Sequence, residues 1–284
     1  MNPLIDLHVH TTASDGIMAP SRLVDFAADS GVVALALTDH DTTDGIDEAV
    51  ARAAIRGIDV IPGIEFSVDH PVGSFHMVGL FIDHGNRKLQ EIITYLKERR
   101  STRIHRMIDD LKMHGIDISL DEVIALSDGG SPGRPHVARV LVKHGFAPSV
   151  KDVFQHFLVP GKPGFVKKDK VTAEVALAGI RDAGGIPVLA HPVSMEYASR
   201  EEFERSLARL IDSGLQGVEA YAYMHTKEEV EYYRSAAVQQ GLIVTGGSDY
   251  HGDKDEKIGW YAEDSPIPYE LYGELLRFRK ANHR

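Results

Sequence analysis

Short runs of apolar residues alternate along the chain with longer segments in which apolar residues recur at the spacing of a helix. The runs are typical of buried strands, and strands are expected at residues 4–10, 32–38, 59–65, 74–82, 186–191, 217–221 and 243–248. Helices are expected between them at residues 20–30, 43–56, 87–114, 172–183, 200–213, 227–240 and 269–280. This alternation predicts an α/β fold around a mainly parallel sheet.

The alternation stops between about residues 101 and 165, where shorter helices are expected at residues 120–126, 135–144 and 150–157. Two segments rich in glycine and proline, "SDGGSPG" and "VPGKPG", interrupt this region. A chain of 284 residues, 43% of them hydrophobic, can bury one large core. We therefore expect one barrel domain at residues 1–100 and 166–284, with a small helical insertion at residues 101–165.

The net charge of −11 argues against a protein that coats nucleic acid, because neutralising phosphates needs clustered Lys and Arg. The charge is unevenly distributed along the chain. Residues 97–170 hold 14 Lys and Arg against 9 Asp and Glu, whereas the rest holds 17 against 33. The run "KERRSTRIHR" in this segment is either a solvated helix face, which is the commoner case, or a positive surface for an anionic substrate.

The chain contains no cysteine, so a disulfide framework and thiolate metal sites are both excluded. Any bound metal must be held by His, Asp and Glu, and the 15 histidines allow such a site. The longest apolar runs are too short to cross a bilayer, and the first residues lack the pattern of an export signal. We expect a cytoplasmic protein with no membrane association and no obligate protein partner.

Polar residues gather where the expected strands end. In "DLHVHTTASDG", His8 and His10 are two residues apart, so a strand would point both imidazoles to one face. Similar residues follow other strands in "TDHD", "PGIE", "LAHP" and "GGSDYH", at the edge where parallel α/β barrels carry active sites. A lone histidine there is usually a structural residue, and Asp44 is expected to lie at a helix N-terminus. Many such residues at one edge are better explained together, by a metal cluster.

The order and spacing of these motifs resemble those of the PHP (polymerase and histidinol phosphatase) phosphoesterase superfamily. The matching segments are "DLHVHTTASDG", "ALTDHDTTDG", "IPGIEFS", "HMVGLFID", "VLAHP" and "GGSDYHG". The resemblance implies a distorted (β/α)7 TIM-like barrel with up to three divalent metals at its C-terminal mouth. The segment "GRPHVARVL" in the insertion is similar to the stand-alone bacterial branch, which includes 3',5'-nucleotide bisphosphate phosphatases and 5'-3' oligoribonucleases.

The resemblance also implies which residues hold the metals. The first metal would be held by His8, His10, Glu65 and Asp249, the second by the bridging Glu65 with His76 and His191, and the third by Asp15, His40 and His251. Mn²⁺ is the implied metal, with Fe²⁺, Zn²⁺ or Mg²⁺ as alternatives. A set of imidazoles and carboxylates suits manganese, iron or zinc better than magnesium.

The activity that this resemblance implies is hydrolysis of the 5'-phosphate of 3',5'-bisphosphonucleotides, such as adenosine 3',5'-bisphosphate, and of short single-stranded RNA from its 5' end. The expected nucleophile is a metal-bridging hydroxide, with Glu65 as the bridging ligand. His225, in "YAYMHTKEE", is a candidate general acid, with a loop or substrate-contact role as the alternative. The residues expected to bind substrate are Arg134, His136, Lys162 and Lys168 in the insertion and just after it.

Three other functions stay open. A histidinol-phosphate phosphatase fits the metal ligands but gives Arg134 and the insertion no role. A non-catalytic, metal-stabilised accessory module would bind phosphoesters without hydrolysing them. A metal amidohydrolase acting on C–N bonds can also carry two histidines at a barrel mouth, and loss of activity in Arg134→Ala would favour the phosphoesterase over it.

Overall fold

The computed structural model describes residues 3–126, 132–252 and 256–282. The chain divides into two compact units, Met1–Ile92 with Val171–Arg284, and Ile93–Lys170. The insertion expected at residues 101–165 lies inside the second unit. The second unit begins before residue 101 and ends after residue 165. Its early start reflects α3 (Arg87–Met113), one continuous helix that begins in the first unit and continues into the second.

The first unit is built on a seven-stranded sheet in which each strand pairs with the next one along the chain. Its strands are β1 (Leu4–Val9), β2 (Val32–Leu37), β3 (Asp59–Val68), β4 (Phe75–Leu80), β5 (Ile186–Leu189), β6 (Gly217–Ala222) and β7 (Ile243–Gly247). A backbone bridge joins Val9 to Tyr250, which follows β7, so the last strand comes back to the first. This nearly closed sheet with surrounding helices confirms the expected distorted (β/α)7 barrel.

The sheet is mixed rather than uniformly parallel, because β4 runs against both β3 and β5. The other neighbouring pairs are parallel. β3 continues to Val68, beyond its expected end at residue 65, since its last residues pair with β4, with Val68 opposite Phe75. An apolar run predicts a strand but not its direction, so the sequence did not reveal this reversal.

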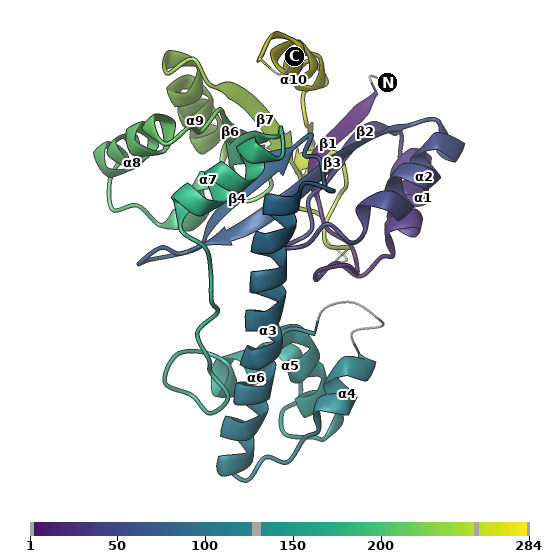
Figure 1. Ribbon diagram of the computed structural model, residues 1–284, viewed down its shortest axis with the longest axis vertical. Helices are drawn as coiled ribbons and strands as arrows, with labels where there is room; N and C mark the ends of the chain where they lie inside the picture. Colours follow the sequence, from purple (N-terminus) through teal and green to yellow (C-terminus); the bar gives the residue numbers. More distant parts are fainter. Residues whose placement is uncertain (1–2, 127–131, 253–255, 283–284) are drawn as a thin grey trace. The chain divides into compact units, whose positions relative to one another are not determined.

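Helices cover the sheet of the first unit, with α1 and α2 together on one side and α8 and α9 together on another (Figure 1). The elements are α1 (Pro20–Asp29), α2 (Ile46–Arg56), α7 (Ala173–Asp182), η1 (Pro192–Met195), α8 (Arg200–Asp212), α9 (Lys227–Gln239), the hairpin β8 (Trp260–Ala262) and β9 (Ser265–Pro266), and α10 (Glu270–Asn282). The side chains of Ile5, Leu35 and Phe66 are fully buried in the core of this unit.

The start of α2 differs from the expectation. The helix begins at Ile46 after the N-cap residue Gly45, so Asp44 precedes the helix and does not cap it. Its first turn instead carries Asp47 and Glu48, whose charges favour a helix N-terminus. The expected N-cap or first-turn role of Asp44 was therefore wrong, because Asp44 and Gly45 lie in a turn before the helix.

The segments on either side of the second unit meet inside the first. The amide of Asp83 donates a hydrogen bond to the Ala183 carbonyl at 2.8 Å, and the Asn86 side chain donates to the Asp182 carbonyl at 2.9 Å. Gly179 of α7 lies so close to Ile92 that a Cβ atom there would come within 2.6 Å of it. The chain thus leaves after β4 and returns before β5, and these two strands pair directly.

The second unit is helical and has a core of its own. It contains most of α3 together with α4 (Leu120–Ala125), α5 (Arg134–Lys143) and α6 (Val150–Phe157), near the helices expected there. The buried side chains of its core include Met107, Leu111, Val137, Leu141 and Val153. Residues 127–131 of the segment "SDGGSPG" lie outside the described residues.

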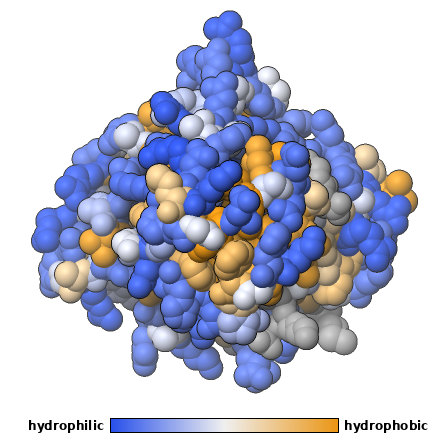
Figure 2. Space-filling view, turned by 90° about the horizontal axis from the view of Figure 1, so that it is seen from below, coloured by the Kyte–Doolittle hydropathy of each residue, from blue (hydrophilic) through white to orange (hydrophobic). Residues whose placement is uncertain are grey.

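Within the described ranges, no helix is both long and apolar enough to span a membrane. The longest, α3, has 27 residues but carries charged side chains along its whole sequence. The face drawn in Figure 2 is mostly hydrophilic, with hydrophobic residues gathered near its middle and a few others toward its edges.

Candidate metal centre

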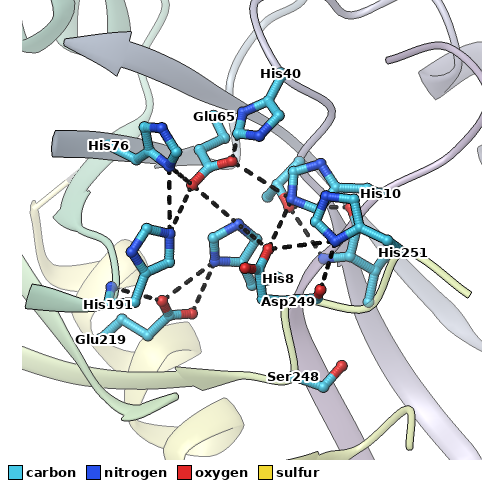
Figure 3. A network of polar contacts seen from close by, with 12 residues as sticks. His8, His10, His40, Glu65, His76, His191, Glu219, Ser248, Asp249 and His251 are labelled. Carbon is cyan, nitrogen blue, oxygen red and sulfur yellow. Dashed lines mark hydrogen bonds and ion pairs between the residues drawn. The ribbon is translucent and has the colours of Figure 1, made fainter. Parts of the chain in front are cut away.

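Histidines and carboxylates from all around the barrel converge at one edge of the sheet (Figure 3). His8 lies on β1, and His10 follows it directly. His40 follows β2 and forms a backbone bridge to Glu65 of β3. His191 precedes η1 after β5, while Asp249 and His251 follow β7. The parallel strands therefore end at this edge, as the sequence analysis expected.

His76 reaches the same edge by a different route. It is the second residue of β4 and lies opposite Ser67 of β3. Because β4 is antiparallel, its beginning and not its end faces the edge where the parallel strands finish. His76 was expected within the strand at residues 74–82 and not after its end, and the reversed direction of β4 is what brings it to this edge.

Glu65 lies at the centre of the cluster and is fully buried. One carboxylate oxygen, Oε1, is 3.3 Å from His8 Nε2, 3.0 Å from His76 Nδ1 and 3.1 Å from His191 Nε2. The other, Oε2, is 3.4 Å from His10 Nε2 and 2.7 Å from His40 Nδ1. Each oxygen faces its own set of imidazoles, as in a carboxylate that bridges two cations. The sets differ from the two expected for Glu65, because His8 shares Oε1 with His76 and His191 while His40 lies beside Oε2.

Two further carboxylates complete the ring. Asp249 Oδ1 is 3.0 Å from His10 Nε2 and 3.5 Å from His8 Nε2. Asp15 lies 3.4 Å from His251 Nε2, and 3.8 Å from both His10 Nδ1 and His40 Nε2. Every metal ligand that the sequence analysis named is therefore brought into one connected cluster.

Donor atoms within 4.8 Å of one another define four overlapping groups. They are His10, Asp15, His40 and His251; His8, His10, Glu65 and Asp249; His40, Glu65 and His76; and His8, His191 and Glu219. The first two contain the expected third and first metal sets. His10 belongs to both, but a neutral imidazole has one lone pair and can serve one metal. The last group contains Glu219, which the sequence analysis did not name.

The buried donor atoms fit a divalent metal. His8 Nε2, both ring nitrogens of His10 and Glu65 Oε2 are buried, and none of them has a hydrogen-bond partner among the residues described. A buried polar atom without a partner costs about 1–3 kcal/mol, and cations at this position would satisfy several of these atoms together. A set of imidazole nitrogens and carboxylate oxygens without sulfur suits manganese, iron or zinc.

The electrostatics of the cluster favour, for several residues, the protonation state that binds a metal. Although burial opposes it, His40, His76 and His8 hold the pKa of Glu65 well below its usual range. Burial lowers the pKa of His76 to about 4, despite the opposing effect of Glu65. Anionic carboxylates and neutral imidazoles are the forms that bind metals. Against burial, Asp15 and Asp249 raise the pKa of His251 to about 10, so positive charge is favoured beside these carboxylates.

Buried carboxylates behind the cluster support its backbone. Asp6 is fully buried and accepts hydrogen bonds from the amides of His8, Ser248 and Gly259, which ties β1 to the segment after β7. Burial raises the pKa of Asp6 to about 6. Asp39 accepts from the amide and hydroxyl of Thr11 and from the hydroxyl of Ser14, next to Asp15. The signal that could have revealed Asp6 is an acidic residue inside an apolar strand run, "LIDLHV".

His225 lies in the turn between β6 and α9 and is buried. Its Nδ1 atom donates to the Ala220 carbonyl at 2.9 Å, and Nε2 has no hydrogen-bond partner in the part of the chain that the structure describes. Burial lowers the pKa of His225. In the neutral ring Nε2 carries the lone pair, so His225 must take up a proton before it can act as a general acid.

The second unit holds the residues expected to bind substrate. Arg134 is the first residue of α5 and is half-buried, with its guanidinium carbon 5.7 Å from the centre of the Phe154 ring. Arg103 of α3 is buried and donates from Nε to the Val166 carbonyl. Burial lowers the pKa of Arg103 to about 10, and the charge of Arg134 acts in the same direction. Two guanidinium groups therefore lie near each other in this unit, and Arg103 was not expected.

The other three residues expected to bind substrate differ in burial and in position along the chain. His136 is buried, and its Nδ1 accepts a hydrogen bond from the Gly133 amide at 2.9 Å, which caps the N-terminus of α5. Lys162 is exposed in a turn after α6, and Lys168 is half-buried further along the chain. The structure thus gives His136 a capping role and places the two lysines on a different segment from Arg134.

Comparisons with known proteins agree with this geometry. The PHP domain matches residues 6–160. The chain is 35% identical over 274 residues to a 3',5'-nucleoside bisphosphate phosphatase of Chromobacterium violaceum, covering 95% of this chain and 96% of that protein. It is 34% identical over 251 residues to the 5'-3' exoribonuclease Rnm of Salmonella typhimurium, covering 87% and 85%. The solved structure of a predicted metal-dependent phosphoesterase from Bifidobacterium adolescentis aligns with a TM-score of 0.84 at 28% identity, over 98% of this chain and 96% of that one.

Proposed function

The chain belongs to the PHP family and is a metal-dependent hydrolase of phosphoric esters, and from this premise we propose that its substrates are nucleoside 3',5'-bisphosphates. The observation that carries the hydrolytic part of the proposal is the buried Glu65 carboxylate, whose two oxygens face separate sets of imidazoles. The similarity to a bisphosphate phosphatase along almost the whole chain, insertion included, supports this substrate class.

In this proposal the cluster holds Mn²⁺ ions. His8, His10, Glu65 and Asp249 would hold one, Glu65 with His76 and His191 a second, and Asp15, His40 and His251 a third. Bound divalent metals activate water and neutralise the oxygens of the phosphoryl group. The carboxylates and imidazoles of the chain hold these charges in fixed positions, so little reorganisation is needed when charge develops on the phosphate. The donor set, rich in imidazole and carboxylate, supports manganese over magnesium.

We propose Arg134 and Arg103 of the second unit as residues that bind a phosphate of the substrate. Burial and the charge of Arg134 both lower the pKa of Arg103, so an anion beside the two guanidinium groups would relieve this repulsion. A guanidinium group binds phosphate through two parallel hydrogen bonds, which also fixes its orientation. Lys168 and the exposed Lys162 would add positive charge near the same ligand. His136 would act through Arg134, because it caps the helix that begins with that residue.

The ester that is cleaved decides the product. The expectation from the sequence is cleavage of the 5'-phosphate, which leaves the nucleoside 3'-monophosphate. A second candidate is cleavage of the 3'-phosphate, which leaves the 5'-monophosphate. The similarity to a 5'-3' exoribonuclease favours this second candidate, because removing the first nucleotide with its 5'-phosphate cleaves the ester at its 3'-oxygen. One binding geometry would then serve both bisphosphates and short RNA.

The leaving alkoxide needs a proton or a cation, and we propose that His225 supplies the proton. Its Nδ1 is held by the Ala220 carbonyl, which fixes the ring, and its Nε2 is available for proton transfer. Because burial lowers its pKa, a proton on Nε2 would be held weakly and transferred readily.

The test is a substrate comparison with protein loaded with Mn²⁺. Adenosine 3',5'-bisphosphate should release phosphate, and chromatography of the remaining nucleotide distinguishes adenosine 3'-phosphate from adenosine 5'-phosphate. The matched controls are these two monophosphates, which carry one phosphate each and should be poorer substrates. Turnover of histidinol phosphate without turnover of the bisphosphate would contradict the proposal. Binding of phosphoesters without hydrolysis of any would indicate an accessory module.

A further inference from the structure

Glu219 is an acidic residue in the middle of β6 and is 3% exposed. The other residues of this strand are Gly217, Val218, Ala220, Tyr221 and Ala222. Burying a carboxylate among such residues is costly unless hydrogen bonds compensate it, so its partners indicate why it is there. Figure 3 shows Glu219 beside His8 and His191.

The first partner of Glu219 is the ring of His8. The Nδ1 atom of His8 lies 3.0 Å from Oε1 and 3.2 Å from Oε2 of Glu219. A carboxylate is an acceptor, so Nδ1 carries the proton and donates it to Glu219. In the neutral ring, which is the form that binds a metal, the lone pair is then on Nε2, which lies 3.3 Å from Glu65 and 3.5 Å from Asp249. Glu219 thus fixes both the tautomer of His8 and the direction of its free nitrogen.

The second partner is the backbone of His191. Its amide donates to Glu219 Oε2 at 2.9 Å. His191 has a φ of 23° and a ψ of 68°, a backbone conformation that residues other than glycine rarely adopt and that must be held by its surroundings. In this conformation the His191 Nε2 atom lies 3.1 Å from Glu65 Oε1. The same carboxylate therefore supports a second imidazole of the cluster.

The neighbouring strand leaves room for this arrangement. A Cβ atom on Gly247 of β7 would come within 2.1 Å of His8 Cβ and 2.7 Å of Glu219 Oε1. Both oxygens of Glu219 accept hydrogen bonds from N–H groups, and these bonds account for its position without a bound cation. This argues against Glu219 as a metal ligand, although it lies within reach of His8 and His191.

We propose that Glu219 is a positioning residue of the metal centre, which orients His8 through its ring and His191 through its backbone. Mutating a residue that holds a metal-binding imidazole from behind commonly lowers metal affinity about 10- to 100-fold. The inference rests on metal binding at the proposed centre and not on the identity of the substrate.

Glu219→Gln tests the proposal with little change in volume. Glutamine has one acceptor oxygen, and its NH₂ group would face either the His8 ring or the His191 amide, both of which are donors. We expect Mn²⁺ affinity, measured by calorimetric titration of metal-free protein, to fall about 10- to 100-fold. The matched control is Glu228→Gln on the exposed surface of α9, which removes the same charge and should bind like the wild type.

The melting temperature of the metal-free proteins separates positioning from a structural role. If Glu219→Gln binds Mn²⁺ with wild-type affinity and stoichiometry, the proposal is overturned. It is also overturned if the loss of binding is accompanied by loss of the folded metal-free state in both Glu219→Gln and the charge-conserving Glu219→Asp. If the wild type itself binds no metal, the proposed function fails, an outcome distinct from equal binding by the wild type and the variant.

Discussion

The imidazole of His10 stacks on that of His251, with ring centroids 4.1 Å apart and planes inclined by 14°. Two imidazolium ions at this distance would repel each other, and burial together with His251 lowers the pKa of His10. A neutral His10 can offer the lone pair of Nε2 beside Asp249, at 3.0 Å, while Nδ1 faces Asp15 at 3.8 Å. His10 therefore connects the two groups of candidate ligands that it belongs to.

His10→Asn should cost metal and activity more than fold. The ring nitrogens of His10 face the cluster carboxylates Asp15, Glu65 and Asp249, so removing the ring costs contacts of the metal centre and not of the hydrophobic core. We expect Mn²⁺ affinity to fall at least about 10-fold, and the free energy of unfolding of the metal-free protein to change by about 1–3 kcal/mol. Metal content after dialysis and thermal melts check this. A variant that keeps the full metal content would contradict the assignment of His10.

Removing the metals should destabilise the protein, because the cluster leaves buried carboxylates and ring nitrogens without compensation. A ligand that binds only the folded state at 100 times its dissociation constant stabilises it by about 2.7 kcal/mol. Calorimetry of the Mn²⁺-loaded and chelator-treated proteins should show a lower melting temperature without metal, restored when Mn²⁺ is returned. Equal melting temperatures would count against a metal centre.

Arg134→Ala should affect bisphosphates selectively. The loss of a charge-assisted pair of hydrogen bonds, about 2–3 kcal/mol, predicts a rise in KM of roughly 30- to 150-fold for adenosine 3',5'-bisphosphate. A small aryl phosphate with one phosphate group should be hydrolysed as before. Arg139→Ala on the exposed side of the same helix is the matched control and should leave both substrates unaffected. An equal effect of Arg134→Ala on both substrates would refute the assigned phosphate contact.

His225→Gln should lower kcat in a manner that depends on the leaving group. An alkoxide needs a proton as it departs, whereas a nitrophenolate does not, so the loss should be about 100-fold or more for a nucleotide and much smaller for p-nitrophenyl phosphate. Steady-state kinetics with both substrates measure this difference. If the two substrates lose activity equally, His225 is a contact or packing residue and not the acid.

Gly247→Ala should disturb the support of His8. The added methyl group would overlap His8 Cβ and press on Glu219, so we expect a loss of stability of about 1–3 kcal/mol together with weaker metal binding. Gly273→Ala in α10 is the control, since a Cβ atom there would meet only the Arg277 side chain at 3.5 Å. Urea unfolding of the metal-free proteins gives the comparison. Unchanged stability in Gly247→Ala would contradict this prediction, because it would show that β7 can move away from His8 of β1 without cost.

The sequence predicted the strands and the members of the candidate cluster well, because both leave local marks. An apolar run that ends in "HVH" or "AHP" indicates a strand and a candidate ligand without knowledge of distant contacts. The direction of β4 leaves no such mark, so the position of His76 at the start of a reversed strand came only from the structure. Asp44 looked like a cap because it precedes a helical pattern, but Gly45 holds that position.

Residues that act through long-range contacts were missed for a physical reason. Glu219 is far from His8 in the chain, and a single acidic residue in a strand does not reveal what it will meet. Arg103 is part of a basic run that is usually a solvated helix face. In the structure, Arg99 is exposed while Arg103 turns toward the interior of its unit and bonds Val166. Which residue of a charged run is buried depends on the packing of the whole helix.

The direct pairing of β4 with β5 has a consequence for the history of this chain. None of the strand pairs that the structure describes in the barrel involves residues 93–170. The chain segments before and after this unit are already joined by the hydrogen bond between Asp83 and Ala183. A lineage could therefore exchange or lose the helical unit while keeping the strands that carry the histidines. If Arg134 binds substrate as proposed, hydrolytic chemistry and the choice of substrate would then be inherited as separable parts of one gene.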